Sequence, residues 1–246
     1  MNRIKVSIIT PCFNSEATIE QTIRSVLYQM YENIEYVIID GRSTDGTMEI
    51  IERYRPLFEG RMKVISEPDH GIYDAMNKGI RNCSGDLIGI INSDDFYEKD
   101  AVETVVSAMT EEKYQILYGM MRIFHGTEEI KVTMPKHENL EEEMIAHPTC
   151  FVTREVYREF GMFDTKYRSC ADHDFMLRMK ETKKVSFLPV YHILASFAEG
   201  GGMSAKGSSM MEAFGMLKEH GIISGKQYRS ISFSYHLKKL LKFGKE

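Results

Sequence analysis

The chain has 246 residues, of which 43% are hydrophobic, and a formal net charge of −5 at pH 7. This length and composition suffice for one α/β domain with a sizeable core and a small appendage. The negative charge argues against a general nucleic-acid binder, because binding to a phosphate backbone requires clustered cations.

Several features lead us to expect a cytoplasmic protein. No apolar run approaches the ~20 residues that span a bilayer, and the first residues lack the apolar core and cleavage site of a signal peptide. The four cysteines have no paired short spacing, so neither a zinc site nor a disulfide framework is indicated. We therefore expect reduced thiols in or near the core.

Strands and helices are predicted to alternate through the first hundred residues. Short β-branched or apolar runs predict strands, and apolar stripes at spacings of three and four predict helices. The predicted strands are 6–10, 34–39, 62–66 and 87–91. One predicted helix begins at residue 15, and two more span 48–54 and 73–81. This alternation predicts a mostly parallel, doubly wound sheet with helices on both faces.

The second half of the chain is less regular and predicts a small antiparallel subregion. After a helix at 102–109, residues 116–124 and 130–134 predict a hairpin. A helix at 171–180, strands at 184–188 and 192–197, and a glycine-rich loop at 200–202 follow. Because no linker is long or polar enough to separate them, we expect one domain over 1–225. Its residues 1–100 would bind a nucleotide and 101–225 a second substrate.

Residues 226–246 form a basic tail with six Lys and Arg residues and one acidic residue. Apolar residues recur there at helical spacings with lysines between them: Phe233, Leu237, Leu240 and Leu241, with Lys238, Lys239 and Lys242. Such a helix suits peripheral contact with an anionic membrane, and it equally suits docking on the domain with solvated lysines. Both interpretations stay open.

Polar residues follow three of the predicted strands, at 10–14, 40–43 and 92–95. In an open parallel sheet, ligands bind beyond the carboxyl ends of the strands. Asp94 and Asp95 follow a buried strand as adjacent carboxylates, which repel each other unless a cation or solvent compensates. Mg²⁺ and Mn²⁺ take such oxygen ligands and share them with nucleotide phosphates. From spacing alone, a metal site and a solvated turn with a helix cap both remain open.

Four ordered segments resemble the donor half of the family 2 glycosyltransferases, which have the GT-A fold. They are VSIITPCFNSEATIEQTIRSVLYQ, YVIIDGRSTDGTMEII, DHGIYDAMNKGI and GIINSDDFY. The segment HPTCFVTREVYREFGMFDTKYRSCADHDFMLRM resembles the acceptor half. The resemblance implies an enzyme that transfers a sugar from a nucleotide-sugar donor to an acceptor, with inversion at the anomeric carbon.

The resemblance also implies roles for residues in the donor half. Pro11, Asn14 and Asp40 fall where the family forms its base and ribose pocket, and Asn77 is a neighbour. Asn92, Ser93 and Asp94 stand at the Asp-X-Asp metal motif, so the chain departs from the family at the first position. An amide is a poor metal ligand but can donate to ribose. We therefore assign Asn92 to the nucleotide and expect Asp94 and Asp95 to hold Mn²⁺ or Mg²⁺ with the donor diphosphate.

In the acceptor half, Asp172 falls on the family's catalytic base, where the usual preceding Glu is replaced by Ala171. The alternative for Asp172 is a helix N-cap, and Asp174 is expected to support or cap the helix. His147 lies in the acceptor region, where it either hydrogen-bonds substrate or is structural. His173 and His192 carry no stronger assignment.

The predicted function is therefore metal-assisted transfer of a sugar to a hydroxyl of a glycan or a lipid-linked acceptor, at the inner face of the membrane if the tail binds there. UDP is the expected nucleotide because it is frequent in the family. One alternative is a sugar-phosphate nucleotidyltransferase, although residues 10–14 lack the glycine-rich loop with an Arg that this class carries. A nucleotide-sugar-binding protein without turnover is the other alternative, motivated by Asn92 and Ala171.

Overall fold

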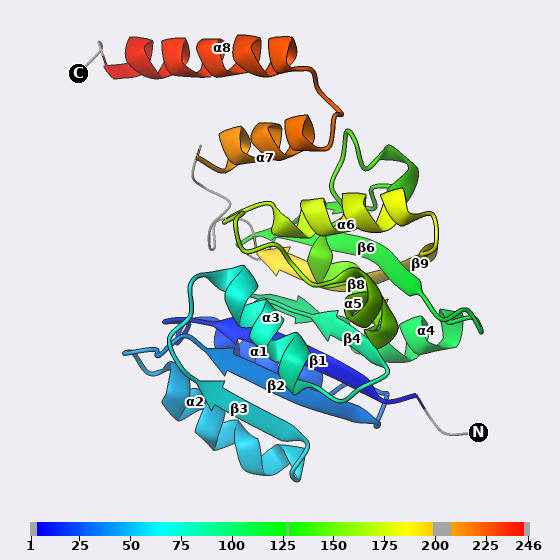
Figure 1. Cartoon of the computed structure of the whole chain (residues 1–246). Helices are drawn as coiled ribbons and strands as arrows, with labels where there is room; N and C mark the ends of the chain where they lie inside the picture. Colours follow the sequence, from blue (N-terminus) through cyan, green and yellow to red (C-terminus); the bar gives the residue numbers. More distant parts are fainter. Residues whose placement is uncertain (1–3, 127, 199–207, 244–246) are drawn as a thin grey trace.

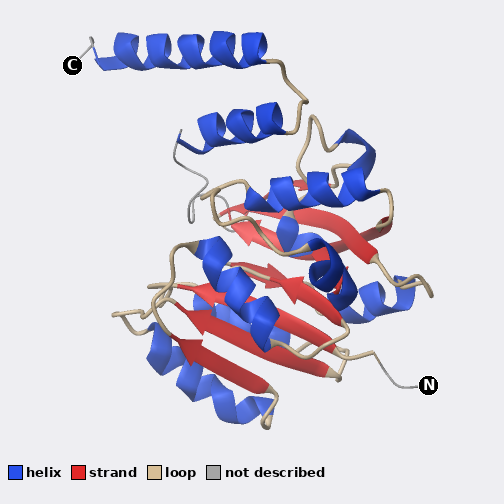
Figure 2. Ribbon diagram, viewed as in Figure 1, coloured by secondary structure: helices blue, strands red, loops and turns tan. Residues whose placement is uncertain are grey.

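The structure is a computed structural model that describes residues 4–126, 128–198 and 208–243. Within these ranges, nine strands form one mixed sheet with helices on both faces (Figures 1 and 2), so the predicted α/β class is observed. The strands are β1 (Val6–Cys12), β2 (Ile34–Asp40), β3 (Met62–Ser66), β4 (Leu87–Ile90), β5 (Asp95–Tyr97), β6 (Gln115–His125), β7 (Glu128–Thr133), β8 (Cys150–Thr153) and β9 (Ser186–Ala198). The helices are α1 (Ile19–Leu27), α2 (Thr47–Tyr54), α3 (Ile72–Asn82), α4 (Ala101–Ala108), α5 (Arg154–Phe160), α6 (Ala171–Thr182), α7 (Ser208–Glu219) and α8 (Gly225–Phe243), with 3-10 turns η1 (Arg55–Phe58), η2 (His137–Asn139) and η3 (His147–Thr149).

The first half of the sheet is parallel, as predicted, and its strands lie in the order β3-β2-β1-β4. One prediction is wrong in detail, because β1 does not stop at Thr10 but continues through Pro11 to Cys12. The Ile9 carbonyl accepts from Ile91, on the β4 side, whereas the Cys12 carbonyl accepts from Gly41, on the β2 side. The backbone nitrogen of Pro11 therefore points to the β4 side, beyond the last residue of β4. Because strand pairing has ended there, the missing N–H of proline removes no hydrogen bond of the sheet.

The second half of the sheet is mostly antiparallel. The predicted hairpin is present as β6 and β7, and the sequence analysis missed β8, which lies antiparallel between β4 and β6. It also missed β5, which pairs with β9. The strands predicted at 184–188 and 192–197 are one strand, β9. Val190 pairs with Gly119 and Ile193 with Met120, so Tyr191 and His192 form a bulge within this continuous strand.

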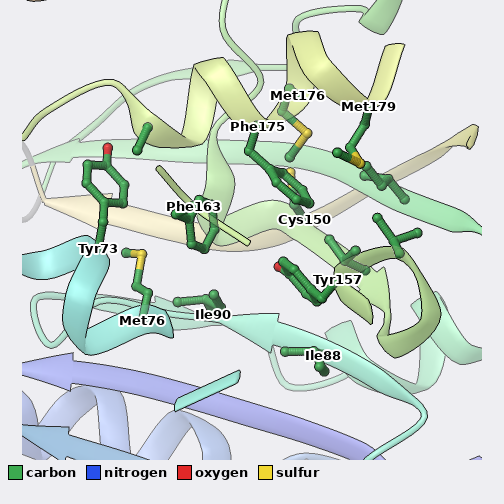
Figure 3. Packing of buried hydrophobic residues seen from close by; sticks show 14 of the residues in the cluster. Tyr73, Met76, Ile88, Ile90, Cys150, Tyr157, Phe163, Phe175, Met176 and Met179 are labelled. Atoms are coloured by element: carbon green, nitrogen blue, oxygen red, sulfur yellow. The ribbon is translucent and has the colours of Figure 1, made fainter. Parts of the chain in front are cut away.

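Two hydrophobic cores lie on opposite faces of the sheet. Neighbouring residues of a strand point to opposite faces, so Ile9 and Ile39 pack in one core with α3, α5 and α6. Ile8 and Ile38 pack in the other core with α1, α2 and α4. Figure 3 shows part of the first core, where Phe163 and Phe175 lie between the strands and α6. Burial on both faces explains why the parallel strands read as continuous apolar runs.

Two C-terminal helices extend the structure beyond α6 (Figure 1). The Glu212 carboxylate of α7 accepts hydrogen bonds from the backbone N–H groups of Arg168 and Ser169, at 2.8 and 2.7 Å. Helix α8 contacts α7, and the side chain of its Phe233 is exposed. The side chains from residue 236 onward lie outside the described set, so the amphipathic stripe of the tail stays a prediction. No helix in the described ranges is both long and apolar enough to cross a membrane.

Candidate active site

A cleft of about 860 Å³ opens at the carboxyl ends of β1 and β4. One wall is formed by residues 11–15, which span the end of β1 and the loop after it, and by Asn92 to Asp95 after β4. A second wall comes from the second half of the chain, with His147, Pro148 and Ser169 among its residues. The cleft therefore lies between the two halves that the sequence analysis assigned to nucleotide and acceptor.

Hydrogen bonds from α1 and from the residues before it fix the loop that carries the two carboxylates. The Thr22 hydroxyl donates to the backbone carbonyl of Asp95 at 2.6 Å. The hydroxyls of Ser15 and Ser93 lie 2.8 Å apart. The loops after β1 and β4 are thus held against each other, and Asp94 and Asp95 reach the cleft together.

The acidic loop leaves oxygen atoms without partners. The Asn92 side-chain nitrogen donates to Asp95 Oδ2 at 3.1 Å, while Asp95 Oδ1 and Asn92 Oδ1 are buried with no hydrogen-bond partner in the described structure. Burial, together with the charge of Asp94, raises the pKa of Asp95 well above its usual value, and the hydrogen bond from Asn92 opposes this shift. A cation nearby would favour the ionised form and satisfy hard oxygen atoms.

The oxygen atoms of the acidic loop fit a divalent cation whose coordination is completed by a ligand. The described residues contain no cluster of three or more His, Cys, Asp or Glu side chains placed to hold a metal. Mg²⁺ and Mn²⁺ sites in nucleotide-dependent enzymes commonly use one or two carboxylates plus phosphate oxygens. Asp94 and Asp95 therefore suffice only if a substrate supplies the remaining oxygen ligands.

The structure brings Pro11 and Asn14 to the cleft, together with the exposed ring of Phe13. Asn14 has a φ of 49°, in the left-handed region that Asn tolerates better than most residues. Its side-chain oxygen accepts from the Thr44 N–H at 2.8 Å, and its own N–H donates to the Ser43 hydroxyl. Asn14 thus ties the loop after β1 to the loop after β2, which is a positioning contact at the edge of the cleft.

Asp40 and Asn77 are not among the described residues that line the cleft, although the resemblance assigned both to the nucleotide pocket. Asp40 is buried, and its carboxylate accepts from the hydroxyls of Ser43 and Ser66 at 2.5 and 2.6 Å. The Asn77 amide is occupied by the backbone of Phe163, donating at 2.9 Å and accepting at 3.1 Å. In this structure both side chains hold loops around the cleft.

On the acceptor side, Asp172 is 5% exposed and lies behind the wall of the cleft. Its Oδ1 accepts from the Tyr73 hydroxyl at 2.8 Å, and its Oδ2 lies 3.4 Å from His147 Nδ1. Figure 3 shows the Tyr73 side chain rising from α3 toward α6, which carries Asp172. Burial alone would raise the pKa of Asp172, but His147, Tyr73 and the His173 N–H together hold it below its usual value.

Asp174 occupies a different environment from Asp172, although both lie in the first turn of α6. Its Oδ2 accepts from Arg178 Nε at 2.8 Å, and its Oδ1 lies 3.0 Å from His220 Nε2. These contacts join α6 to the end of α7. Asp174 is therefore directed away from the cleft and toward the C-terminal helices.

The sequence analysis did not single out several residues that line the cleft. They are Asp69, Ile72, Tyr73 and Met76 around the start of α3, and Met121, Met144, Ser169 and Phe197 from the second half. Asp69 stood in a segment already quoted for the resemblance, and its charge at a strand-to-helix loop was a usable signal. Met121 on β6 and Phe197 on β9 offered none, because only the pairing of those strands brings them to the cleft.

Comparison with known proteins identifies the family. Residues 7–179 match glycosyl transferase family 2, so the chain belongs to this family and is a glycosyltransferase. It is 28% identical over 200 residues to the PGL/p-HBAD biosynthesis glycosyltransferase of Mycobacterium bovis, covering 80% of this chain and 78% of that protein. It is 32% identical over 183 residues to an uncharacterized glycosyltransferase of Mycobacterium tuberculosis, covering 70% of this chain and 68% of that protein.

Solved structures confirm the GT-A fold. The 1–349 fragment of TarS from S. aureus, in complex with UDP-GlcNAc, superposes with a TM-score of 0.70 at 19% identity over 87% of this chain. The mannosyltransferase PcManGT from Pyrobaculum calidifontis, in complex with GDP-Man and Mn²⁺, superposes with a TM-score of 0.63 at 17% identity over 88%. The chain spans 39% of the longer TarS chain, 65% of its fragment and 63% of PcManGT.

Proposed function

We propose that the protein transfers a sugar from a nucleotide-sugar donor, with UDP as the expected nucleotide, to a hydroxyl of a glycan or lipid-linked acceptor, with inversion at the anomeric carbon. The observation that carries the proposal is one cleft with adjacent carboxylates on one wall and, on the other wall, His147 in the lining with the buried Asp172 in contact with it. Its volume lies in the range of small-molecule sites. An inverting transfer needs this separation, because the acceptor attacks opposite the leaving diphosphate.

The chain's residues would divide the work between the two walls. Asp94 and Asp95 would hold a divalent ion against the donor diphosphate, and Asn92 keeps Asp95 oriented through its amide. Such an ion supplies Lewis-acid stabilisation of the departing nucleotide diphosphate. Phe13 and Asn14 lie on the donor wall, while the wall that includes Ser169 and Pro148 would receive the acceptor.

The choice of acceptor is supported by one relative, which is named for PGL/p-HBAD biosynthesis. Contact of the basic tail with an anionic membrane would bring the enzyme to a lipid-linked acceptor. We also propose that the protein is cytoplasmic and that its tail contacts the membrane. The rival function is a nucleotide-sugar-binding protein without turnover, favoured by the amide at Asn92 where the family carries an acid. Membership of family 2 favours sugar transfer over nucleotidyl transfer.

The test is a nucleotide-release screen of the purified chain with UDP-, GDP- and dTDP-sugars, in Mn²⁺ and in Mg²⁺, run alongside calorimetric titration with the same compounds. We expect one donor class to bind and to release nucleotide with metal present. Binding of a donor without release under any condition would refute transfer and support the binding protein. Release of pyrophosphate from a nucleoside triphosphate and a sugar phosphate would support nucleotidyl transfer instead.

A further inference from the structure

One side chain of helix α7 holds the wall of the cleft that we propose receives the acceptor. The Glu212 carboxylate accepts from the backbone N–H groups of Arg168 and Ser169 at 2.8 and 2.7 Å. Its Oε2 also accepts from the Ser169 hydroxyl at 2.6 Å and lies 3.6 Å from the Cys170 thiol. Ser169 itself lines the cleft. A single carboxylate from α7 therefore contacts three consecutive residues at the edge of the site.

The loop that Glu212 contacts has no regular structure of its own. Residues 161–170, between α5 and α6, form neither helix nor strand, so their backbone groups must find partners outside a helix or a sheet ladder. Tyr167 and Cys170 are buried in the first core, on either side of Arg168 and Ser169. Glu212 accepts from the N–H groups of the two residues between them. The stretch that reaches the cleft is thus fixed by a side chain from another element.

Helix α7 is itself held in place at its other end. Met216 is fully buried in the first core. The Glu219 carboxylate accepts from the Tyr167 hydroxyl at 2.8 Å, and His220 Nε2, directly after the helix, lies 3.0 Å from Asp174 Oδ1. The carboxylate that holds the loop therefore extends from a docked helix.

The Glu212 carboxylate is kept in its charged form by the loop. Burial alone would raise its pKa, but hydrogen bonds from Ser169 and Arg168 outweigh burial and hold the pKa below its usual value. Hydrogen bonds to an ionised acceptor are roughly twice as strong as those between neutral groups. Helix α7 lies beyond residues 7–179, which match the family, so the match assigns no role to this contact.

We propose that Glu212 is a positioning residue for the acceptor: it fixes the backbone of Arg168 and Ser169, and with it the wall of the cleft that leads into α6 and Asp172. This inference rests on the proposed function, in which this wall receives the acceptor. Glu212 is not among the described residues that line the cleft, so it would act through the loop without touching substrate. A misplacement of about 1 Å can lower turnover about 10²-fold. The effect should therefore appear in turnover and not in donor binding.

The experiment compares Glu212→Ala and Glu212→Gln with the wild-type chain. Nucleotide release is measured with the panel donor that the wild type turns over, with water or glycerol as the acceptor, and donor binding is measured by calorimetry. We expect Glu212→Ala to lower kcat by about 10- to 100-fold and to leave the donor Kd within a few-fold. Glu212→Gln keeps the length of the side chain and one accepting oxygen, so its kcat should lie between those of Glu212→Ala and the wild type.

Amide hydrogen exchange gives a second measurement that does not depend on turnover. Exchange over residues 165–170 should be fastest in Glu212→Ala, slower in Glu212→Gln and slowest in the wild type, because exchange reports local opening of the backbone. The order of the three chains should match the order of their kcat values. A stabilising role of α7 alone would not produce this match.

Two control variants separate positioning from lost stability. Glu219→Gln is the same exchange in the same helix, but its carboxylate contacts the side chains of Tyr167 and Lys166 and no backbone of the loop. Its kcat should stay near that of the wild type. Ile51→Ala removes buried volume from the core on the opposite face of the sheet, so it should lower Tm and leave kcat near normal well below Tm.

The proposal is overturned if folded Glu212→Ala keeps the wild-type kcat, or if Ile51→Ala loses as much turnover, because α7 would then only stabilise the fold. Loss of donor affinity in Glu212→Ala would also overturn it, since the effect would lie on the donor side. If Glu212→Ala does not fold, the same criteria apply to Glu212→Gln. Unchanged exchange over residues 165–170 would show that Glu212 does not hold the loop. A wild-type chain that binds donors without releasing nucleotide refutes the proposed function itself, which is a separate outcome.

Discussion

Replacing Asn77 with Ala separates a structural role from a nucleotide-binding role. The Asn77 amide is buried and bridges α3 to the segment before α6 by bonding both the N–H and the C=O of Phe163. The Phe163 ring packs against Tyr73 and Phe175, with ring centroids 5.7 and 5.3 Å away. The substitution would therefore leave a buried donor and a buried acceptor of the backbone without partners, next to the residues that hold Asp172.

The expected cost follows from those two groups. A buried backbone group left unsatisfied costs about 1–3 kcal/mol, so the pair should lower the free energy of unfolding by about 2–6 kcal/mol. For a chain of this size, each kcal/mol lowers Tm by about 2–4 °C, which gives a fall of roughly 4–24 °C. The affinity for UDP, the nucleotide that we propose, should change by no more than about twofold, because in this structure the side chain does not line the cleft.

The matched control is Asn82→Ala, at the end of the same helix. Its side-chain nitrogen donates to the Lys78 carbonyl, and its oxygen accepts from Lys63, at the surface. The change in residue type is identical, but the hydrogen-bond partners of Asn82 remain solvated, so we expect the free energy of unfolding to fall by about 1 kcal/mol or less. Thermal and urea unfolding with calorimetric UDP titration would measure both variants. If Asn77→Ala keeps a normal Tm but binds UDP tenfold more weakly, Asn77 contacts the nucleotide and the bridging role is wrong.

Three further predictions concern the metal, the C-terminal helices and the tail. EDTA should abolish nucleotide release, added Mn²⁺ or Mg²⁺ should restore it, and Asp95→Asn should have the same effect as EDTA. Full activity in EDTA would mean that the two carboxylates form only a solvated turn with a helix cap. Burial lowers the pKa of His220, but Glu181 and Asp174 outweigh it and raise the pKa above 6.5. This contribution to stability is present below pH 6.5 and lost as pH rises through the folded-state pKa, so His220→Gln should destabilise the protein more at pH 6 than at pH 9, and an equal loss at both would contradict the ion pair. Binding to anionic vesicles should weaken with salt and vanish in a chain ending at Gly225; equal binding by that shorter chain would exclude the tail as the contact.

Local patterns in the amino-acid sequence were enough to predict the parallel half of the sheet. Its strands and helices carry strong local periodicity, so their alternation along the chain could be predicted before any contact was known. The residue pattern placed the acidic residues after the fourth predicted strand, and the structure brings Asp94 and Asp95 to a cleft at that edge. The β6 and β7 hairpin was also predictable, because its two strands are neighbours in the chain.

Contacts between residues that are distant in the chain could not be predicted from such patterns. Strand β8 is four fully buried residues with no alternating pattern, yet its position between β4 and β6 joins the two halves of the sheet. That joining brings Tyr73 to within hydrogen-bonding distance of Asp172, 99 residues later in the chain. Local patterns report which face of an element is buried, but they carry no information about the element it is buried against. The surroundings of Asp172, and the position of His147 in front of it, therefore follow from strand pairing and helix packing.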